Sequence, residues 1–474
     1  MDAVARLPRM TVSTPVPPNA LPSQRDAWKA MFALSVGFFV SLLDQTMVAV
    51  ALSGIQHDLG ASINQVMWVS AVYLLAVVVP LLFTGRLGDI YGQRTVFRIG
   101  ITLFGIGAVA CALAPNIEFL IVARVVQGLG ASIQMPQTMS VINRVFARER
   151  RGRALGVWGI VGSVATLTGP LLGGFLVSAF GWQSVFWVHV PFAFLAVVLV
   201  TVWVPALPTT ARQVDYVSVG VSLLALGALV FGIQQGPEVG WTWKIWLLLA
   251  AGAVFVGLFV WLQSTAPRRG TQALVPLQLF GDRNYSAGSI AIVAMGFMAA
   301  SMMLPLMFWL QDFKGLNAGE AGALVAPMAV VSMVLSPAAG ALADKLAPRI
   351  LAISGFSTLI VALAAAAFIM GADLSALWLL IPVVLLGVGQ SFVWGSNAAT
   401  TMRDVPPRLM GAASGVYNTS RQLGSVLGVA VASAAMQMAQ GALGLVHAVF
   451  VIVVALLGGL VASLFFRDTL HSNT

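Results

Sequence analysis

The sequence predicts an all-α polytopic membrane protein that crosses the bilayer fourteen times, and two observations carry this prediction. First, 59% of the 474 residues are hydrophobic and only 9% are charged, whereas an average soluble domain has about 25% charged residues. Second, the apolar segments are about 20 residues long, the length that an α-helix needs to cross about 30 Å of hydrocarbon. Strands of a membrane barrel are about half as long and alternate polar with apolar residues, so helices are favoured over a barrel.

Charge and cysteine content exclude several classes of function. The formal net charge is +9, but the basic residues are scattered between apolar segments, so nucleic-acid binding is not expected. The single cysteine, Cys111, lies inside one apolar segment, which excludes an internal disulfide and a cysteine-based metal cluster. No catalytic triad, metal-ligand cluster or nucleotide-binding loop is visible in the sequence. We therefore expect neither an enzyme nor an ATP-driven pump, and no cofactor or bound metal.

The predicted elements follow a polar, proline-bearing segment, residues 1–26, which is expected to be a disordered cytoplasmic tail. The first apolar segment is too long for a cleaved signal peptide and contains Asp44, so it is interpreted as the first spanning helix. The expected spans are 27–52, 66–86, 95–115, 117–140, 152–178, 183–204, 215–235, 242–264, 286–311, 319–343, 348–371, 375–402, 410–437 and 445–466.

The distribution of Lys and Arg predicts the orientation of these spans, because cytoplasmic loops retain positive charge. With the N-terminus inside, most of the 25 Lys and Arg residues fall on the cytoplasmic side, including a cluster between Arg144 and Arg153. This bias favours an even number of spans with both termini cytoplasmic. The expected location is the inner (cytoplasmic) membrane of a cell, with the lipid bilayer as a partner.

An internal repeat divides the chain into two halves. The segment G-R-L-G-D, Gly85 to Asp89, returns in weakened form as G-A-L-A-D, Gly340 to Asp344, and two further glycine-containing segments recur at nearly the same offset. Ordered matches of this kind are typical of transporters built from repeated helical bundles. The predicted parts are an N-terminal six-helix bundle (27–204), an inserted helix pair with flanking linkers (205–285), a C-terminal six-helix bundle (286–466) and a cytoplasmic C-terminal tail (467–474).

The loop expected after the second span reads G-R-L-G-D-I-Y-G-Q-R, and its glycines permit a tight turn. It resembles the corresponding loop of the major facilitator superfamily, specifically of the fourteen-helix drug/proton antiporter branch. This resemblance runs from about residue 35 to 465 and implies the major facilitator fold. It also implies a conformational latch, made of Gly85, Asp89, Gly92, Arg94 and, in the second half, Asp344. An ordinary charged turn is the alternative, and Ile90 stands where the family usually has a basic residue.

The fifth span contains A-T-L-T-G-P-L-L-G-G, which resembles the motif of antiporters in this superfamily. Pro170 removes one helix hydrogen bond, and small residues allow tight packing against another span. The resemblance therefore implies a bendable seam at Gly169, Pro170, Gly173 and Gly174. Generic small-residue packing is the alternative interpretation.

Asp44 is the only carboxylate that we place well inside a span, in L-D-Q-T-M-V-A-V-A-L. A carboxylate at that depth is costly when ionised and by default marks a transport pathway. Arg124, in R-V-V-Q-G-L-G of the fourth span, resembles the superfamily motif associated with proton coupling. Asp44 and Arg124 are therefore the predicted coupling pair, although Arg421 in the thirteenth span is a second possible partner. A static ion pair that joins helices is the alternative.

Flat amphipathic substrates are bound well by aromatic and Met side chains. The residues predicted to line a substrate cavity are Asp44, Trp68, Tyr73, Met135, Phe308, Trp394, Tyr417 and Arg421. For any single aromatic or Met residue of this set, packing or lipid contact is the alternative. His189 stands where the family usually has Asn, and a hydrogen-bonded structural role is preferred to a titrating one.

The expected function is secondary active transport. The leading hypothesis is proton-coupled export of small amphipathic or cationic compounds, that is, multidrug efflux by alternating access of the two bundles. Its partners would be a small-molecule substrate and protons, and the protein is expected to be a monomer. The first alternative is an exporter of a dedicated metabolite, lipid or peptide-like product. The second is a membrane sensor that has lost transport.

Overall fold

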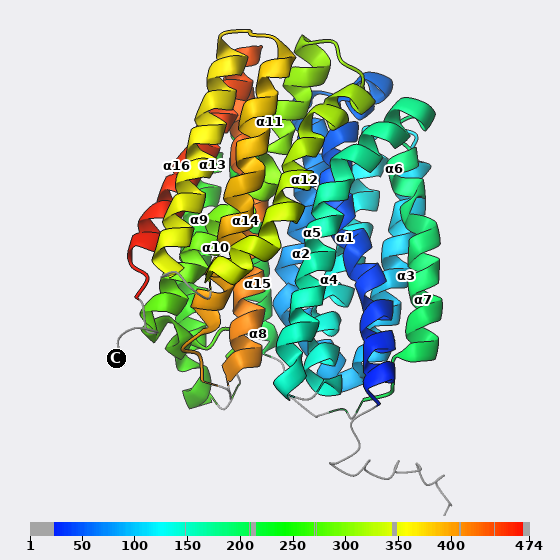
Figure 1. The fold of residues 1–474 in the computed structure, drawn as a ribbon, viewed down its shortest axis with the longest axis vertical. Coiled ribbons are helices and arrows are strands. Elements are labelled where there is room, and N and C mark those ends of the chain that lie inside the picture. Colours follow the sequence, from blue (N-terminus) through cyan, green and yellow to red (C-terminus); the bar gives the residue numbers. More distant parts are fainter. Residues whose placement is uncertain are drawn as a thin grey trace, which may run out of the picture.

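The protein is built from helices throughout the part of the chain that the structure describes (Figure 1). The structure is a computed structural model, and it describes residues 23–467 except for 147, 208, 210–214, 270, 272, 344–347, 407–408 and 440. Each of the fourteen predicted spans overlaps one helix or a run of two or three consecutive helices. The apolar pattern therefore located the helices along the whole described chain.

The helices form two bundles and a peripheral pair. The N-terminal bundle contains α1 (Gln24–Leu59), α2 (Ile63–Tyr91), α3 (Gln93–Ala112), α4 (Ile117–Val145), α5 (Arg148–Phe180), α6 (Ser184–Trp187) and α7 (His189–Trp203). The peripheral pair is α8 (Tyr216–Gln235) and α9 (Trp243–Thr265), followed by η1 (Ala266–Arg269) and η2 (Leu277–Gly281). The C-terminal bundle contains α10 (Arg283–Ser301), α11 (Met303–Phe308), η3 (Trp309–Phe313), α12 (Ala318–Ala343), α13 (Pro348–Gly371), η4 (Ala376–Leu379), α14 (Leu380–Met402), α15 (Met410–Gln437) and α16 (Ala442–Leu464).

Within the described residues, twelve helical segments are long and apolar enough to cross a membrane, so the predicted count of fourteen is not supported by this criterion. The two helices that fall short are α5 and α15. In α5, many side chains before Thr168 lie outside the described residues, and the described apolar stretch is Thr168–Phe180. In α15, Asn418, Arg421 and Gln422 interrupt the apolar sequence.

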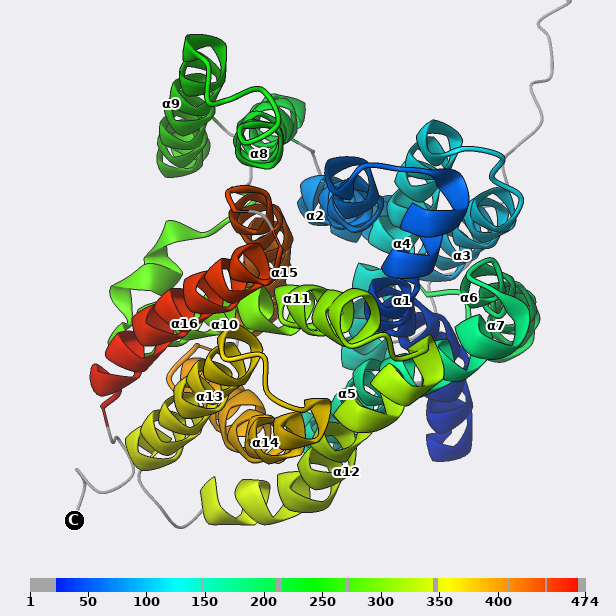
Figure 2. The same ribbon diagram turned by 90° about the horizontal axis from the view of Figure 1, so that it is seen from above.

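The view along the bundle shows how the helices are layered (Figure 2). The central helix is α1, and 83% of its most apolar stretch is buried inside the protein, compared with 17% for α9. The two bundles meet where α5 packs on α12, α2 packs on α15 and α1 packs on α11. The peripheral pair lies outside both bundles, with α8 against α2 and α15 and with α9 against α8.

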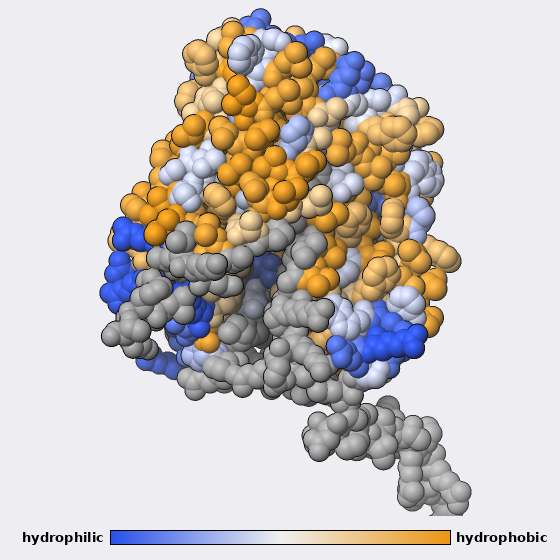
Figure 3. Space-filling view, viewed as in Figure 1, coloured by the Kyte–Doolittle hydropathy of each residue, from blue (hydrophilic) through white to orange (hydrophobic). Residues whose placement is uncertain are grey.

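The surface agrees with a membrane environment. On the face shown in Figure 3, hydrophobic residues cover most of the middle, and hydrophilic residues gather towards the upper and lower margins. Large apolar side chains such as Phe194, Val254 and Phe368 are about 70% exposed. Lipid accepts such side chains, whereas helices satisfy their backbone polar groups internally.

The segment that we predicted as a loop after the second span is helical instead. The helix α2 continues through Gly85 and Asp89 to Tyr91, and the chain turns only at Gly92, whose φ is 87°. A positive φ of this size favours glycine. Gly88 serves close packing, because a Cβ atom there would overlap the side chain of Gln137 in α4. The loop was predicted too early because the apolar pattern ends before the helix does.

Hydrogen bonds between the bundles occur at the end of the molecule where α1 terminates, which we call the distal end. Gln311 Nε2 donates to the Val50 carbonyl over 3.2 Å, and the Gly319 amide donates to Ser178 Oγ over 2.7 Å. Ser53 Oγ also donates to the Asp312 carboxylate. These bonds join α1 and α5 to η3 and α12, so the two bundles are held together at the distal end.

The helix α8 adds a second link at the distal end. Gln234 Nε2 donates to Ser433 Oγ of α15 over 2.7 Å. The neighbouring Gln235 Oε1 accepts hydrogen bonds from Asn64 Nδ2 over 3.2 Å and from Trp68 Nε1 over 3.3 Å, both in α2. Two adjacent glutamines therefore connect one bundle to the other through the peripheral pair.

We predict that the double substitution Gln234→Ala and Gln235→Ala favours separation of the bundles at the distal end. A buried hydrogen bond contributes about 1 kcal/mol, so losing this cluster shifts the equilibrium by about 1–3 kcal/mol. The measurement is the yield of a disulfide between cysteines placed at Ser178 and Asn317, whose side chains lie 3.4 Å apart across the seam. The yield is expected to fall in the double variant. The control is Gln278→Ala, which should leave the disulfide yield unchanged. If the double variant gives the same yield as this control, α8 does not hold the bundles together at the distal end.

Candidate functional site

The candidate site is centred on Asp44 in the middle of α1. Its side chain is fully buried. Arg124 Nη1 of α4 donates to both carboxylate oxygens, over 2.9 Å and 2.8 Å. Gln127 Nε2, one turn further along α4, donates to Asp44 Oδ1 over 3.0 Å. The buried carboxylate is therefore held by one cation and one amide, both from the same face of α4.

The Arg124 side chain is buried and has several partners besides Asp44. It is 1% exposed. Its Nε donates to the Val69 carbonyl of α2 over 3.0 Å, and its Nη1 also donates to Gln127 Oε1 over 2.8 Å. The guanidinium carbon lies 4.0 Å from the centre of the Tyr73 ring, a distance typical of a cation–π contact. Arg124 therefore retains several partners when Asp44 is neutralised.

This arrangement determines what the pair can do. Removing two charges from water costs several kcal/mol for each ion, and only close pairing with additional hydrogen bonds offsets that cost. The pair of Asp44 and Arg124 meets this condition when both residues are charged. A proton on Asp44 would remove the carboxylate charge and weaken its hold on Arg124. The strength of the pair therefore depends on the charge of the Asp44 carboxylate.

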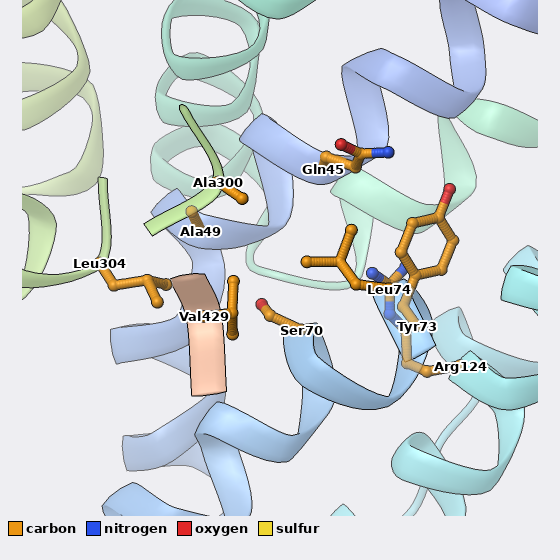
Figure 4. A pocket seen from close by; sticks show the side chains of 9 residues that line it. All are labelled: Gln45, Ala49, Ser70, Tyr73, Leu74, Arg124, Ala300, Leu304 and Val429. Atoms are coloured by element: carbon orange, nitrogen blue, oxygen red, sulfur yellow. The ribbon is translucent and has the colours of Figure 1, made fainter. Parts of the chain in front are cut away.

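A small cavity lies beside the pair, at the meeting point of the two bundles (Figure 4). Its volume is about 10 Å³, which is room for about one water molecule. The N-terminal bundle and the C-terminal bundle both contribute walls, namely Gln45, Ala49, Ser70, Tyr73, Leu74 and Arg124 from the first and Ala300, Leu304 and Val429 from the second. Both bundles therefore contact the cavity beside the charged pair.

The structure places the predicted cavity residues in different surroundings. Tyr73 and Arg124 line the cavity, and the Tyr73 hydroxyl donates to the Ser41 carbonyl over 3.2 Å. Asp44 lies behind Arg124. The other predicted residues do not line this cavity; they are Trp68, Met135, Phe308, Trp394, Tyr417 and Arg421. Asp44 pairs with Arg124 and not with Arg421, which forms no salt bridge among the described residues.

Two of the residues outside the cavity have other partners. The Tyr417 hydroxyl accepts a hydrogen bond from Asn397 Nδ2 over 2.9 Å, which joins α15 to α14. Trp68 donates to Gln235 of α8, as described above. Packing roles therefore account for these two aromatic side chains in this closed arrangement.

The glycines of the fifth span lie on two helix interfaces. A Cβ at Gly169 would overlap the side chain of Thr46, and one at Gly173 would lie 3.2 Å from the Met47 Cα, so this face of α5 packs on α1. A Cβ at Gly174 would lie 2.6 Å from the Ala318 carbonyl oxygen of α12. Pro170 lies inside α5 at the same level. The predicted seam residues are thus located where α5 contacts both bundles.

The predicted latch residues are described only in part. Gly92 forms the turn between α2 and α3, and the Arg94 guanidinium donates to the Thr201 carbonyl of α7. Gly85 lies within α2, facing Pro136 of α4. Asp344 and the side chain of Asp89 lie outside the described residues. The latch therefore stays a prediction.

Two residues beside the pair were not among the predicted coupling or cavity residues; for His189 a hydrogen-bonded structural role was expected. Gln127 lies in the same motif as Arg124, three residues later, and that spacing places it on the same helix face. His189 of α7 is fully buried, and its Nε2 lies 3.8 Å from Asp44 Oδ1. The sequence offers a signal for Gln127, but it offers none for the approach of α7 to α1.

Comparison with known proteins gives the same family throughout. The family described as Major Facilitator Superfamily matches residues 34–429. The chain is 41% identical to an uncharacterised MFS-type transporter of Mycobacterium tuberculosis (strain ATCC 25618 / H37Rv), over 87% of this chain and 71% of that protein. It is 32% identical to the multidrug resistance protein Stp of M. tuberculosis (strain CDC 1551 / Oshkosh), over 85% and 74%. It is 30% identical to the tetracenomycin C resistance and export protein of Streptomyces glaucescens, over 85% and 75%.

Solved structures support the fold. The chain is similar to a D-xylose-proton symporter, with a TM-score of 0.65 over 93% of this chain and 97% of that one. The identity of 13% limits this likeness to the fold.

Proposed function

The chain belongs to the major facilitator superfamily, and on that premise we propose that it exports small amphipathic or cationic compounds in exchange for protons. Its family and relatives are transporters rather than enzymes. The proposal concerns the finer points: the direction of transport, the coupling ion and the class of cargo.

One observation carries the proposal, namely the fully buried pair of Asp44 and Arg124 beside a cavity between the bundles. Protonation of Asp44 releases Arg124 to its remaining partners, the Val69 carbonyl, Gln127 and the Tyr73 ring. A cationic cargo would compete with the proton for the same carboxylate. This competition produces exchange if the protein with a proton on Asp44 opens to one side of the membrane and the protein with cargo at Asp44 opens to the other.

The proposal includes a membrane arrangement. The long helices α5 and α15 pack alongside twelve apolar spans, and we propose that they also cross the bilayer, which restores fourteen spans. Because Lys and Arg are concentrated on the cytoplasmic side, both termini lie on the cytoplasmic side of the inner membrane. The distal end then faces away from the cytoplasm. The closed distal end then corresponds to a state that is sealed towards the outside. We propose that the protein acts as a monomer.

The antiporter seam and the latch have distinct proposed roles. The glycines of α5 allow it to slide between α1 and α12 while the distal end opens and closes. The latch around Asp89 acts at the opposite end and favours one state of the cycle. Neither element needs to touch the cargo.

A second candidate function is export of one dedicated product. It is favoured by the relative that is named for tetracenomycin C export, whereas the multidrug resistance relative favours a broad range of cargo. A membrane sensor without transport is disfavoured because the charged pair is costly to bury without a use in the cycle.

The decisive experiment measures uptake of a fluorescent cationic dye into energised inverted vesicles that contain the purified protein. We expect uptake that depends on the pH gradient and stops when a protonophore is added. Dye movement that ignores the protonophore would count against proton exchange. A panel of unrelated dyes separates broad export from export of one product.

We predict a preference for monovalent over divalent cationic cargo. Among the described residues, Asp44 is the only carboxylate buried in the middle of a spanning helix, whereas Asp312, Glu320 and Asp373 lie at helix ends. Two like charges about 4 Å apart repel by roughly 4 kcal/mol at an effective dielectric constant near 20, so a second cationic centre near Arg124 is strongly disfavoured.

The measurement compares matched mono- and dicationic analogues in one vesicle assay. The monocation is expected to be exported at least about tenfold more efficiently, which corresponds to about 1.4 kcal/mol. Equal transport of the dication would mean that another carboxylate reaches the cargo.

A further inference from the structure

His189 lies at the start of α7, immediately after the short helix α6, and its side chain is fully buried. Its ring points to the charged pair, with Nε2 3.8 Å from Asp44 Oδ1. The Phe104 ring of α3 meets it edge to face, with ring centres 5.7 Å apart. The imidazole is therefore packed between an aromatic ring and the carboxylate.

Neither ring nitrogen of His189 has a hydrogen bond of normal geometry among the described residues, and the backbone of Val185 and Phe186 supplies only loosely aligned acceptors. A buried polar group in this condition costs about 1–3 kcal/mol, and such groups are uncommon in folded proteins. The separation of 3.8 Å from Asp44 is too long for a hydrogen bond, and a movement of less than about 1 Å would form one.

We propose that His189 is a proton-relay residue, which passes protons to and from Asp44 during transport. This inference rests on the proposed function and adds a named path for the coupling ion. His189 does not line the small cavity between the bundles, so the relay requires no contact between its imidazole and a cargo in that cavity.

The proton balance of the relay is simple. A proton binds one nitrogen of the neutral imidazole, and the proton on the other nitrogen moves to the Asp44 carboxylate. His189 ends neutral in its other tautomer, and Asp44 ends as a neutral carboxylic acid. Net charge at the site rises by one, and the extra positive charge is that of Arg124, which no longer has an anionic partner. Release runs through the same steps in reverse.

The ionisable groups around His189 come from four helices. Asp44 of α1 faces it directly, Arg124 of α4 holds that carboxylate, and Tyr73 of α2 lies beyond Arg124. Cys111 of α3 contacts Gln127 through its thiol. The described apolar part of α5, Thr168–Phe180, contains no ionisable residue. Among these ionisable groups, Asp44 is thus the one that faces the imidazole directly.

The test compares His189→Asn with the wild-type protein in liposomes, using two assays. Substrate exchange without a gradient needs no net proton movement, whereas export driven by a pH gradient does. We expect His189→Asn to keep exchange and to lose about tenfold or more of gradient-driven export, since a positioned proton-transfer group contributes about 100-fold or more. The dependence of export on external pH should also flatten.

The control is His447→Asn, which changes an exposed histidine of α16. It should behave as wild type in both assays. His189→Gln is measured in parallel, so that a folding defect of one variant does not decide the result. Equal loss of exchange and of driven export would indicate a structural role and overturn the proposal, as would no loss in either assay. If wild-type export ignores the gradient, the proposed function itself fails and the relay fails with it.

Discussion

Replacing Asp44 by Asn is expected to reduce gradient-driven export to the level of protein-free vesicles. Asn keeps nearly the same shape but cannot bind or release a proton, so the pair with Arg124 loses its two states. The variant imitates the protonated form that the proposed cycle already visits. It should therefore insert and fold. The measurement is dye export by purified protein in vesicles with an imposed pH gradient.

A stability measurement must accompany this result. Removing one partner of a buried ion pair costs about 3–5 kcal/mol, because the other charge is left uncompensated. Here Arg124 keeps the Val69 carbonyl and Gln127, so we expect a cost below that range. The double variant Asp44→Asn with Arg124→Gln should recover stability without recovering export.

The matched control is Asp58→Asn, which makes the same change at an exposed position of the same helix. It should leave export unchanged. Full gradient-driven export by purified Asp44→Asn would remove the carboxylate from the coupling mechanism.

The fold was predictable because its main signal is local. An apolar segment of about 20 residues indicates a spanning helix whatever lies elsewhere in the chain. The helix ends were less predictable, as α2 shows, because helices continue beyond the apolar core until a residue such as Gly92 breaks them. The helix α15 differs from the apolar pattern because it has polar residues and packs on other helices.

The candidate site was predictable only where a residue is unusual by itself. Asp44 and Arg124 were visible because charges inside spans are rare and costly. The face on which Trp394 or Met135 lies could not be read from the sequence, since aromatic and Met side chains suit lipid, packing and substrate alike. The position of His189 depends on the packing of α7 against α1 and α3, which no local pattern encodes.

Replacing Gly322 by Leu is expected to abolish transport through a different mechanism, by preventing closure of the distal end. Gly322 of α12 faces α5, and a Cβ atom there would lie 2.5 Å from the Pro170 carbonyl oxygen. That oxygen belongs to the backbone and has little freedom to move. Overpacking of this kind costs about 1–3 kcal/mol even for smaller insertions, so the seam between α5 and α12 should separate. Both dye export and gradient-free substrate exchange depend on closure, and both should fall to background.

The same substitution separates closure from coupling. In Gly322→Leu, the disulfide between cysteines at Ser178 and Asn317 should form in much lower yield, because those positions are 3.4 Å apart only when the seam is closed. In Asp44→Asn, by contrast, the disulfide should still form. The control is Gly458→Leu in α16, where an added side chain meets nothing within 4 Å. If Gly322→Leu keeps both the disulfide yield and the transport rate, the added side chain fits between α5 and α12 and the distal end still closes. The glycines of α5 would then be a packing feature and not a moving seam.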